Sequence, residues 1–369
     1  MVAMEPGKMS RSFIGPLRMG FILAIVFICL IASILVLDRD SLSSKIFDAG
    51  NHGVFPEAQQ PSSSDSETNR STISNRPLIL YAYADSQDGT ALENLKFFIA
   101  HGLHAAADFK FIMNGDTKAG SFVPKKDNIQ VIKRSNTCYD LGAFAEVLLK
   151  DDLYKKYKRF ITMNASIRGP FVPYWSEGCW TDMFLNKITD EVKLVGMTAN
   201  CWPTFHIQSM IWATDIMGIQ TLLFPPQKAL DYLSSHPITL PAFSASQNDP
   251  PQPSSSTTPL PSRYGINGCF NTYASAVGAE VSSTSLILAA GYKVDAMMSA
   301  YHGLKEYEEN RSCGENRDVL WEGKYFGIDV HPFETVFIKA NRDLAPLVLE
   351  RHSEWVEKRR YSSYDYCRA

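Results

Sequence analysis

The sequence lacks the short motifs that mark several common enzyme classes. It contains no GxxxxGK(S/T), HExxH, GxSxG or GxGxxG segment. This argues against P-loop nucleotide hydrolysis, zincin proteolysis, serine hydrolysis and dinucleotide redox chemistry. None of its seven cysteines lies in a Cys-x-x-Cys pair, so a zinc ribbon or a thioredoxin-type centre is not expected either.

A strong charge of one sign is also missing. The chain has 36 Lys and Arg residues against 39 Asp and Glu residues, for a net charge of -3, and its pI is near 6.3. Nucleic-acid binding therefore has no electrostatic support. With 45% hydrophobic and 20% charged residues among 369, the composition is that of an ordinary globular protein.

Residues 19–37 form an apolar run without a formal charge, and this is about the length that a helix needs to cross a bilayer. Three basic residues precede the run: Lys8, Arg11 and Arg18. The positive-inside rule then predicts a single-pass signal anchor, with residues 1–18 as a cytosolic tail and the rest of the chain outside the cytosol or in a lumen. The alternative is a cleaved signal peptide whose cleavage site lies near residues 41–43.

The chain after this run divides by composition. Residues 38–76 are rich in Ser, Pro, Gln and Asn and predict a flexible stem. Residues 77–345 predict one folded domain, which is interrupted at 241–263 by a mobile loop rich in Pro and Ser. Residues 346–369 predict a C-terminal helical tail.

Two further observations agree with a secretory compartment. Asn69-Arg70-Ser71 and Asn310-Arg311-Ser312 are sequons for N-glycosylation. Six cysteines follow the apolar run, at positions 138, 179, 201, 269, 313 and 367. In an oxidising lumen they predict up to three disulfides, but the sequence alone does not choose among the possible pairings.

Short apolar runs alternate with helical patterns in the first half of the folded part. The runs that predict strands are 78–83, 109–113, 129–132, 160–163 and 192–196. Between them, Thr90 and Glu93 form the pattern of a capping box, and Asp140 has the position of an N-cap. Strands that alternate with helices predict an α/β fold with a doubly wound, mostly parallel sheet. Ligands of such sheets lie beyond the carboxyl ends of the strands.

The polar residues that follow these strands are therefore the candidate binding residues. They are Asp85, Asn114, Arg134, Asp140, Asn164, Ser166, Arg168 and Asn200. Arg168 stands out because a guanidinium binds a diphosphate through two parallel hydrogen bonds, and Asn164 and Ser166 would face the same anion. The alternative is an ordinary strand-to-turn segment in which Gly169-Pro170 supplies the turn.

Two more candidates lie later in the chain. Glu280 comes at the start of a predicted helix that opens at Gly278. It is either a first-turn acid that the helix dipole stabilises or a carboxylate that takes a proton from an attacking hydroxyl. His331, together with Glu334, precedes a strand-like run at 335–338, where it could hold a metal or a phosphate.

Five segments carry a resemblance to a known family. They are residues 136–144 (NTCYDLGAF), 160–171 (FITMNASIRGPF), 192–201 (VKLVGMTANC), 206–215 (HIQSMIWATD) and 331–339 (HPFETVFIK). These segments resemble a family of eukaryotic glycosyltransferases that is distantly similar to bacterial rhamnan-synthesis F-type proteins. The resemblance covers roughly residues 78–342, except for the loop at 241–263.

The resemblance implies a GT-A-like nucleotide-sugar fold. In such folds the fourth strand usually ends in a DXD motif, whose carboxylates hold a divalent ion, Mn²⁺ or Mg²⁺, against the sugar diphosphate. Here the matching position reads Asn164-Ala165-Ser166, which puts the metal in doubt, and Arg168 is expected to take over part of the charge neutralisation. By the same resemblance Glu280 is the general base, and His331 matches a C-terminal metal-binding histidine.

These expectations describe a type II, single-pass Golgi membrane glycosyltransferase with a lumenal catalytic domain. It would transfer a sugar from a nucleotide-diphosphate sugar to a hydroxyl of a glycan or glycoconjugate. The donor-binding residues would then be Asp85, Asn114 and Arg134 beside the nucleotide, Asn164, Ser166 and Arg168 beside the diphosphate, and Asp140 and Asn200 as second candidates. The alternative is a non-catalytic lumenal binding or scaffold protein that keeps the fold.

Overall fold

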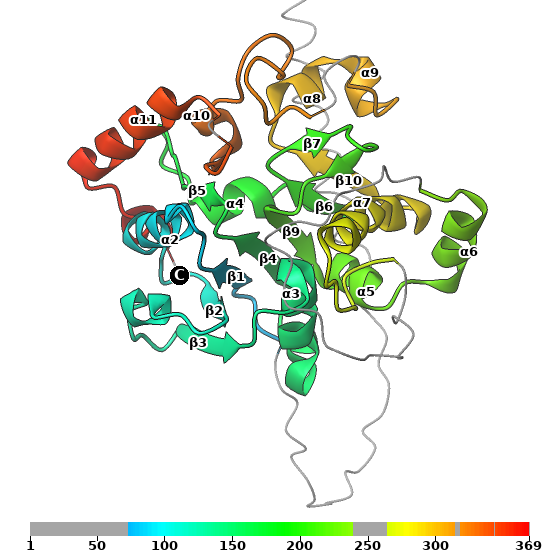
Figure 1. Cartoon of the computed structure of the whole chain (residues 1–369), viewed down its shortest axis with the longest axis horizontal. Coiled ribbons are helices and arrows are strands. Elements are labelled where there is room, and N and C mark those ends of the chain that lie inside the picture. Colours follow the sequence, from blue (N-terminus) through cyan, green and yellow to red (C-terminus); the bar gives the residue numbers. More distant parts are fainter. Residues whose placement is uncertain (1–72, 239–263, 314–317, 343, 369) are drawn as a thin grey trace, which may run out of the picture. The chain divides into compact units, whose positions relative to one another are not determined.

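A computed structural model describes residues 73–238, 264–313, 318–342 and 344–368 of the chain (Figure 1). The predicted cytosolic tail, the anchor at 19–37, the sequon at Asn69 and the loop at 241–263 lie outside these described residues. Within the described ranges, no helix has both the length and the apolar character needed to cross a bilayer.

The core of the folded part is a sheet of seven strands in the order β10-β6-β9-β4-β1-β2-β3. Their bounds are β1 (Leu78–Ala84), β2 (Asp108–Asn114), β3 (Ile129–Arg134), β4 (Arg159–Asn164), β6 (Val192–Gly196), β9 (Ile211–Asp215) and β10 (Lys293–Ala296). The five strands predicted from the sequence are β1, β2, β3, β4 and β6. Four neighbouring pairs run parallel: β1 with β2, β2 with β3, β1 with β4, and β6 with β10. The predicted mostly parallel α/β sheet is therefore confirmed.

Strand β9 departs from this pattern, because it runs antiparallel to both of its neighbours, β4 and β6. The chain between β6 and β9 forms only a short two-stranded unit, β7 (Ala199–Asn200) with β8 (His206–Ile207), and no crossover helix. A parallel return needs a crossover of a dozen or more residues, usually helical. The 14 residues between Gly196 and Ile211 hold no such helix, and β9 runs back in the opposite direction.

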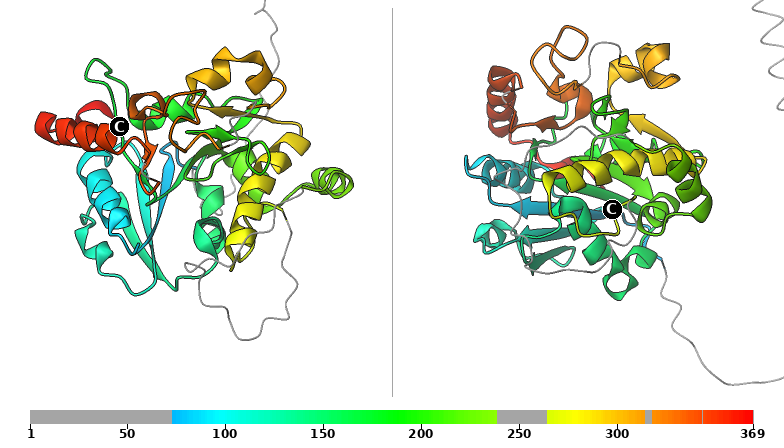
Figure 2. Two further views of the ribbon diagram at one scale, coloured as in Figure 1. Left: turned by 45° about the horizontal axis from the view of Figure 1, so that its top comes forward. Right: turned by 45° about the vertical axis from the view of Figure 1, so that its right-hand side comes forward.

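Helices cover both sides of the sheet. On one side lie α2 (Thr90–His101) and α4 (Trp180–Leu185), and on the other lie α3 (Tyr139–Leu149), α5 (Ile216–Leu223) and α7 (Tyr273–Ala289). The left view of Figure 2 shows the cyan helix α2 and the yellow helix α7 on opposite sides of the strands. On the α2 side, the Phe98 ring packs 5.0 Å from Tyr81 of β1 and 5.8 Å from Trp180 of α4, measured between ring centroids. Such aromatic clusters supply much of the buried apolar area of a core.

The remaining elements are short or lie near the C-terminus. They are η1 (Ala119–Phe122), η2 (Lys150–Lys156), β5 (Ile167–Arg168), α6 (Gln227–Ser235), α8 (Ser299–Gly303), α9 (Lys305–Glu308), α10 (Pro332–Thr335), β11 (Ile338–Lys339), α11 (Pro346–Arg359) and α12 (Ser363–Tyr366). Strands β5 and β11 pair antiparallel, which joins the segment after β4 to the C-terminal part of the chain. The strand-like run predicted at 335–338 is thus displaced, since α10 ends at Thr335 and the strand begins at Ile338.

Two predicted helix starts are wrong in detail. Helix α2 begins after Gly89, whose φ of 77° places it in the left-handed region, and its first amides donate to Asp88 and Ser86 rather than to an N-cap side chain. The predicted capping box is therefore absent, and the Thr90 hydroxyl instead donates to Asp88 at 2.8 Å. Asp140 is not an N-cap, because α3 begins one residue earlier, after Cys138.

The interpretation of Glu280 as a first-turn acid is also wrong. Helix α7 begins at Tyr273, where Thr272 and Ser275 form a reciprocal capping box. Glu280 therefore lies in the middle of the helix, beyond the reach of the N-terminal dipole, which acts mainly within the first turn. This change leaves a role at a cleft as the remaining interpretation.

Three disulfides connect distant segments: Cys138–Cys269, Cys179–Cys367 and Cys201–Cys313. They confirm the predicted number and select one pairing. The first holds the start of α3 next to the segment that leads into α7. The second ties the C-terminus to α4, and the neighbouring Ser363 hydroxyl donates to the carbonyl of His101 in α2 at 2.6 Å. The helical C-terminal segment is thereby packed onto the α2 side of the fold.

Candidate functional site

A cleft of about 900 Å³ lies at the carboxyl ends of β1, β2 and β4, with residues of α3, α7 and β11 in its wall. Six of the candidate residues from the sequence line it: Asp85, Asn114, Asp140, Asn164, Ser166 and Glu280. The cleft also has the position in which open α/β sheets bind ligands. Residues chosen for their position at strand ends therefore make up part of the wall, and Glu280 of α7 adds to it.

Asp85 and Asn114 follow β1 and end β2. Asp85 is exposed, and one of its oxygens accepts hydrogen bonds from Tyr83 Oη at 2.6 Å and Thr117 Oγ1 at 3.0 Å. Burial, together with the Asp85 carboxylate, raises the pKa of Tyr83. Asn114 is buried, donating to the Tyr83 carbonyl at 3.0 Å and accepting from Arg134 at 2.7 Å. These bonds hold both side chains in fixed positions at the strand ends.

Asp140, Asn164 and Ser166 form one hydrogen-bonded group in the cleft. The Asn164 amide nitrogen donates to Asp140 Oδ2 at 2.5 Å, and its oxygen accepts from the Ser166 amide at 3.1 Å and hydroxyl at 2.6 Å. The other Asp140 oxygen accepts from the amide of Leu141 at 3.0 Å. Burial is the main cause that raises the pKa of Asp140, the nearby Glu280 raises it further, and the Asn164 bond opposes both. A raised pKa brings a carboxylate closer to the range useful for proton transfer near neutral pH.

Glu280 is held from the side opposite Asp140. Its Oε1 accepts from the backbone amide of Ser209 at 2.5 Å, and its Oε2 lies 3.9 Å from Nε2 of the buried His206. The side chain keeps 19% of its surface exposed, so it is anchored but still accessible from the cleft. A carboxylate that is fixed by a backbone donor and open on one side is suited to accept a proton from a bound hydroxyl.

The sequence argument missed two cations that line the cleft, Lys339 and Arg342. Arg342 is paired, because its Nη1 lies 2.6 Å from Asp318 Oδ2 and its guanidinium lies over the Trp321 ring at 5.1 Å. Lys339 forms no side-chain hydrogen bond or ion pair with any residue that the structure describes. Both residues come at or just after the end of the 331–339 segment, in which only His331 and Glu334 were considered as candidates and 335–338 was interpreted as a strand. Two basic residues at and just after the end of that segment were the one signal in the sequence that could have pointed to these cations.

Arg134 and Arg168 are not in the wall of the cleft. Arg134 lies behind Asn114 with 6% of its side chain exposed, and its Nη2 is 2.6 Å from Glu146. Arg168 is directed toward α2, where it donates to Asn94 at 2.8 Å and to Glu93 at 2.9 Å. From these positions neither guanidinium is free to contact a ligand in the cleft. The structure therefore does not show the contacts to a sugar donor that were predicted for Arg134 and Arg168.

Asn200 and His331 also lie outside the cleft wall. Asn200 is buried and donates to Asp318 at 3.0 Å. This hydrogen bond helps to hold Asp318, the ion-pair partner of Arg342, in position. His331 caps α10 through Nδ1, which accepts from the Phe333 amide at 3.2 Å, and its ring packs 4.9 Å from that of His352. Glu334, its proposed companion, instead accepts from Ser299 and Tyr325 at 2.5 Å. Among the residues that the structure describes, no carboxylate completes a metal site at His331.

The residues at the DXD position do not fit a divalent ion. Asn164 and Ser166 carry no charge, and the oxygen of Asn164 is already used within the group. Carboxylate oxygens are the ligands that Mg²⁺ and Mn²⁺ prefer, yet no three His, Cys, Asp or Glu side chains in the described part of the cleft lie close enough to share an ion. Lys339 also lines the same space. A metal is therefore not assigned a place in this site.

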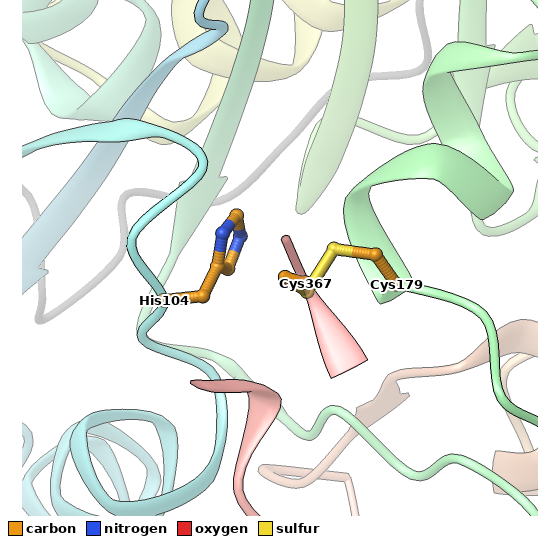
Figure 3. Close-up of side chains that lie close together, drawn as sticks. All are labelled: His104, Cys179 and Cys367. Carbon is orange, nitrogen blue, oxygen red and sulfur yellow. A yellow bond between two sulfur atoms is a disulfide. The ribbon is translucent and has the colours of Figure 1, made fainter. Parts of the chain in front are cut away.

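A cluster of metal-ligating residue types does occur elsewhere, on the α2–α4 side, where His104 lies beside Cys179 and Cys367 (Figure 3). The two cysteines are joined as a disulfide, so their sulfurs are not thiolates. Nδ1 of His104 accepts from the Ala106 amide at 3.2 Å, which places the proton on Nε2, the other ring nitrogen. That tautomer has no lone pair on Nε2 for a metal. The cluster is therefore a structural part of the core.

Comparisons with known proteins give a distant likeness only. No protein-family model matches the chain, and no curated protein matches its sequence. Among solved structures, the chain is similar to the glycosyltransferase GlyE of Streptococcus pneumoniae TIGR4, with 10% identity and a TM-score of 0.38 over 79% of this chain and 66% of that chain. Its apo form gives 9% identity and a TM-score of 0.38, over 78% and 64%.

The chain thus spans slightly less than two thirds of the length of those structures. A likeness at this TM-score carries no argument about the site or its substrates. The functional argument therefore rests on the geometry of the cleft.

Proposed function

We propose that this chain is a glycosyltransferase that moves a sugar from a nucleotide-diphosphate sugar to a hydroxyl of a glycan or glycoconjugate. The observation that carries the proposal is the meeting of Asp140, Glu280 and Lys339 in one cleft at the carboxyl ends of parallel strands. These residues come from three distant parts of the chain. The resemblance of the surrounding segments to glycosyltransferases points to the same reaction.

In this proposal Glu280 is the general base. Its contact with the Ser209 amide fixes the carboxylate, and its exposed side faces the cleft. An acceptor hydroxyl bound there would lose its proton to Glu280 as its oxygen attacks the sugar. Asp140 is the second candidate, since its raised pKa also suits proton transfer. Asp215, a further acid in the resembling segments, is already paired with Lys193 at 2.6 Å and caps α5.

The cell compartment and topology belong to the same proposal. We place the folded domain in the Golgi lumen as part of a type II, single-pass membrane protein. Three disulfides support an oxidising compartment, and the basic residues before the apolar run at 19–37 support a cytosolic N-terminus. An N-terminal tag found on the lumenal side of sealed vesicles would contradict this topology.

A second candidate function is binding without transfer. It is favoured by one observation, the replacement of the expected carboxylates by Asn164 and Ser166, which are neutral. A chain of this kind would keep nucleotide-sugar binding as a lumenal scaffold. The two candidates differ in turnover and not in binding.

The test is a donor screen with the full-length chain. Nucleotide-diphosphate sugars are incubated with the protein, with and without a panel of glycan acceptors, and released nucleoside diphosphate and sugar products are measured. Release or transfer with one donor supports the enzyme, provided that Glu280→Gln abolishes it. Thermal stabilisation by a donor without any turnover across the acceptor panel would favour the binding protein instead.

A further inference from the structure

Lys339 differs from the other cations near the cleft, because its charge has no partner in the described part of the chain. Arg342 is paired with Asp318, and Arg134 is paired with Glu146. Lys339 is partly buried, yet its ammonium meets no carboxylate or carbonyl among the described residues within hydrogen-bonding distance. A partly desolvated cation without a partner is unfavourable by itself. Such a group in the wall of an open cleft is suited to meet an anion.

The backbone fixes Lys339 beside the position at which a metal would have been expected. Its strand, β11, pairs with β5 so that Lys339 lies opposite Ile167. The next amide along, that of Ala340, donates to the carbonyl of Ser166 at 2.9 Å. Lys339 therefore lies next to the end of the Asn164-Ala165-Ser166 segment, on a backbone that hydrogen bonds hold in register, and it lines the same cavity as that segment.

The charged groups near Lys339 leave its ammonium unpaired. Asp140, Glu280 and Asp318 act on it electrostatically as anions, and Arg342 acts on it as a second cation. None of the carboxylates is within ion-pairing distance of its ammonium. The cleft thus holds the unpaired ammonium of Lys339 in the same cavity as two carboxylates, Asp140 and Glu280, that suit the acceptor side of a reaction.

We propose that Lys339 binds the diphosphate of the nucleotide-sugar donor directly, so that the protein neutralises this charge without a divalent ion. The inference rests on the function proposed above and identifies what replaces the metal. An ammonium can donate three hydrogen bonds to phosphate oxygens. It thereby stabilises the charge that grows on the leaving group.

Sugar transfer breaks one bond at the sugar carbon and forms another. The bond between the sugar carbon and the phosphate oxygen breaks, and its electron pair stays on that oxygen. The acceptor oxygen forms the new bond to the same sugar carbon, and its proton passes to Glu280. Lys339 keeps its protons and interacts with the released nucleoside diphosphate by charge and hydrogen bonds alone.

The experiment measures binding of UDP, GDP and inorganic pyrophosphate to the full-length chain by calorimetry, in EDTA and then with added Mn²⁺. Three variants are compared: Lys339→Gln, Lys339→Arg and Lys228→Gln, an exposed lysine on α6 that serves as a control. We expect at least one nucleoside diphosphate to bind in EDTA. Lys339→Gln should weaken it about 10- to 100-fold, the usual range for losing a hydrogen bond to a charged group.

The arginine variant and the control separate charge from folding. Lys339→Arg should keep most of the affinity because it keeps the cation, and Lys228→Gln should bind like the parent chain. Equal binding in Lys339→Gln and the parent would overturn the inference, as would binding that appears only with Mn²⁺.

Pyrophosphate separates this inference from the proposed function. If pyrophosphate binds through Lys339 but no nucleotide sugar is ever turned over, the anion site stands and the transferase proposal fails. If a donor is turned over with no contribution from Lys339, the transferase stands and this inference fails.

Discussion

Arg168 and Lys339 lie on the two strands of one short antiparallel ribbon, but they face different parts of the molecule. In the ribbon Arg168 is opposite Ile338, and Lys339 is opposite Ile167. Directly opposed residues of an antiparallel pair point to the same face, while consecutive residues alternate. Arg168 therefore points toward α2, and Lys339 points toward the cleft. Two cations one register step apart thus have different surroundings.

The same contrast holds for the two sides of the sheet more widely. On the α2–α4 side, Arg168 is bonded to Asn94, and His104 is buried in the core beside the Cys179–Cys367 disulfide. On the cleft side, Asp140, Glu280 and Lys339 line a cavity. The comparison predicts that substitutions on the cleft side change turnover or ligand affinity. Substitutions on the α2–α4 side should change stability instead.

The largest expected effect is on the cleft side, in Glu280→Gln. Glutamine can still accept from the Ser209 amide, but it cannot take the proton of the acceptor. We expect kcat to fall about 10²–10⁴-fold, the usual cost of losing a general base, with donor affinity and thermal unfolding close to those of the parent. Steady-state kinetics and calorimetry check this. Full activity in Glu280→Gln and loss in Asp140→Asn would transfer the role to Asp140.

On the α2–α4 side, His104 should make the fold sensitive to acid. Burial lowers the pKa of His104 to about 4, with a smaller contribution from Arg76, whereas an unfolded histidine has a pKa near 6.5. The folded state then binds fewer protons than the unfolded state between these values, so stability is full above about pH 6.5 and is lost as the pH falls toward 4.

The loss attributable to His104 should approach about 3 kcal/mol at the acid end. Denaturant unfolding at several pH values measures it, with His104→Asn as the comparison, because asparagine can still accept from the Ala106 amide. Equal pH dependence in the parent and His104→Asn would contradict the assignment.

A smaller effect is expected for Arg168→Met, again on the α2–α4 side. Methionine fills similar space but leaves the oxygen of the buried Asn94 without its donor. An unsatisfied buried group of this kind costs about 1–3 kcal/mol, so the unfolding free energy should fall by that amount. Affinity for nucleoside diphosphate should stay unchanged. If affinity falls while stability does not, Arg168 contacts the ligand and the two sides are not separated as described.

The smallest expected effect is a pH dependence of ligand binding on the cleft side. Burial is the main cause that lowers the pKa of Lys339 to about 8, Arg342 lowers it too, and Glu280, Asp140 and Asp318 oppose them. Lys339 is therefore charged below about pH 8 and loses its charge above it. Nucleoside diphosphate affinity should fall by up to about tenfold between pH 7.5 and 9, since the phosphate itself is ionised above about pH 7.

Arginine gives the control for this pH effect. In Lys339→Arg the side chain stays charged throughout the range, so the affinity should become nearly independent of pH. A parent chain with flat pH dependence, or an Arg variant with the same slope as the parent, would show that another group titrates.

The strand positions and the sheet class could be predicted from the sequence because both follow from local patterns. Apolar runs such as 78–83 and 192–196 predict buried strands from their own residues, without knowledge of what they pack against. Their alternation with helices predicts parallel pairing. Polar residues at or after the ends of β1, β2, β3 and β4 could be found for the same reason. Asp85, Asn114, Asp140, Asn164 and Ser166 all line the cleft.

Only the tertiary structure decided the rest, because it depends on contacts between distant segments. The start of α7 at Tyr273 placed Glu280 in mid-helix, and the chain returns after β6 without a crossover helix, so that β9 is antiparallel. The register of β5 with β11 turned Arg168 away from the cleft and Lys339 toward it. The sequence of one strand does not show its pairing register, because the register is set together with the partner strand. Here the partner of β5 is β11, which lies far along the chain.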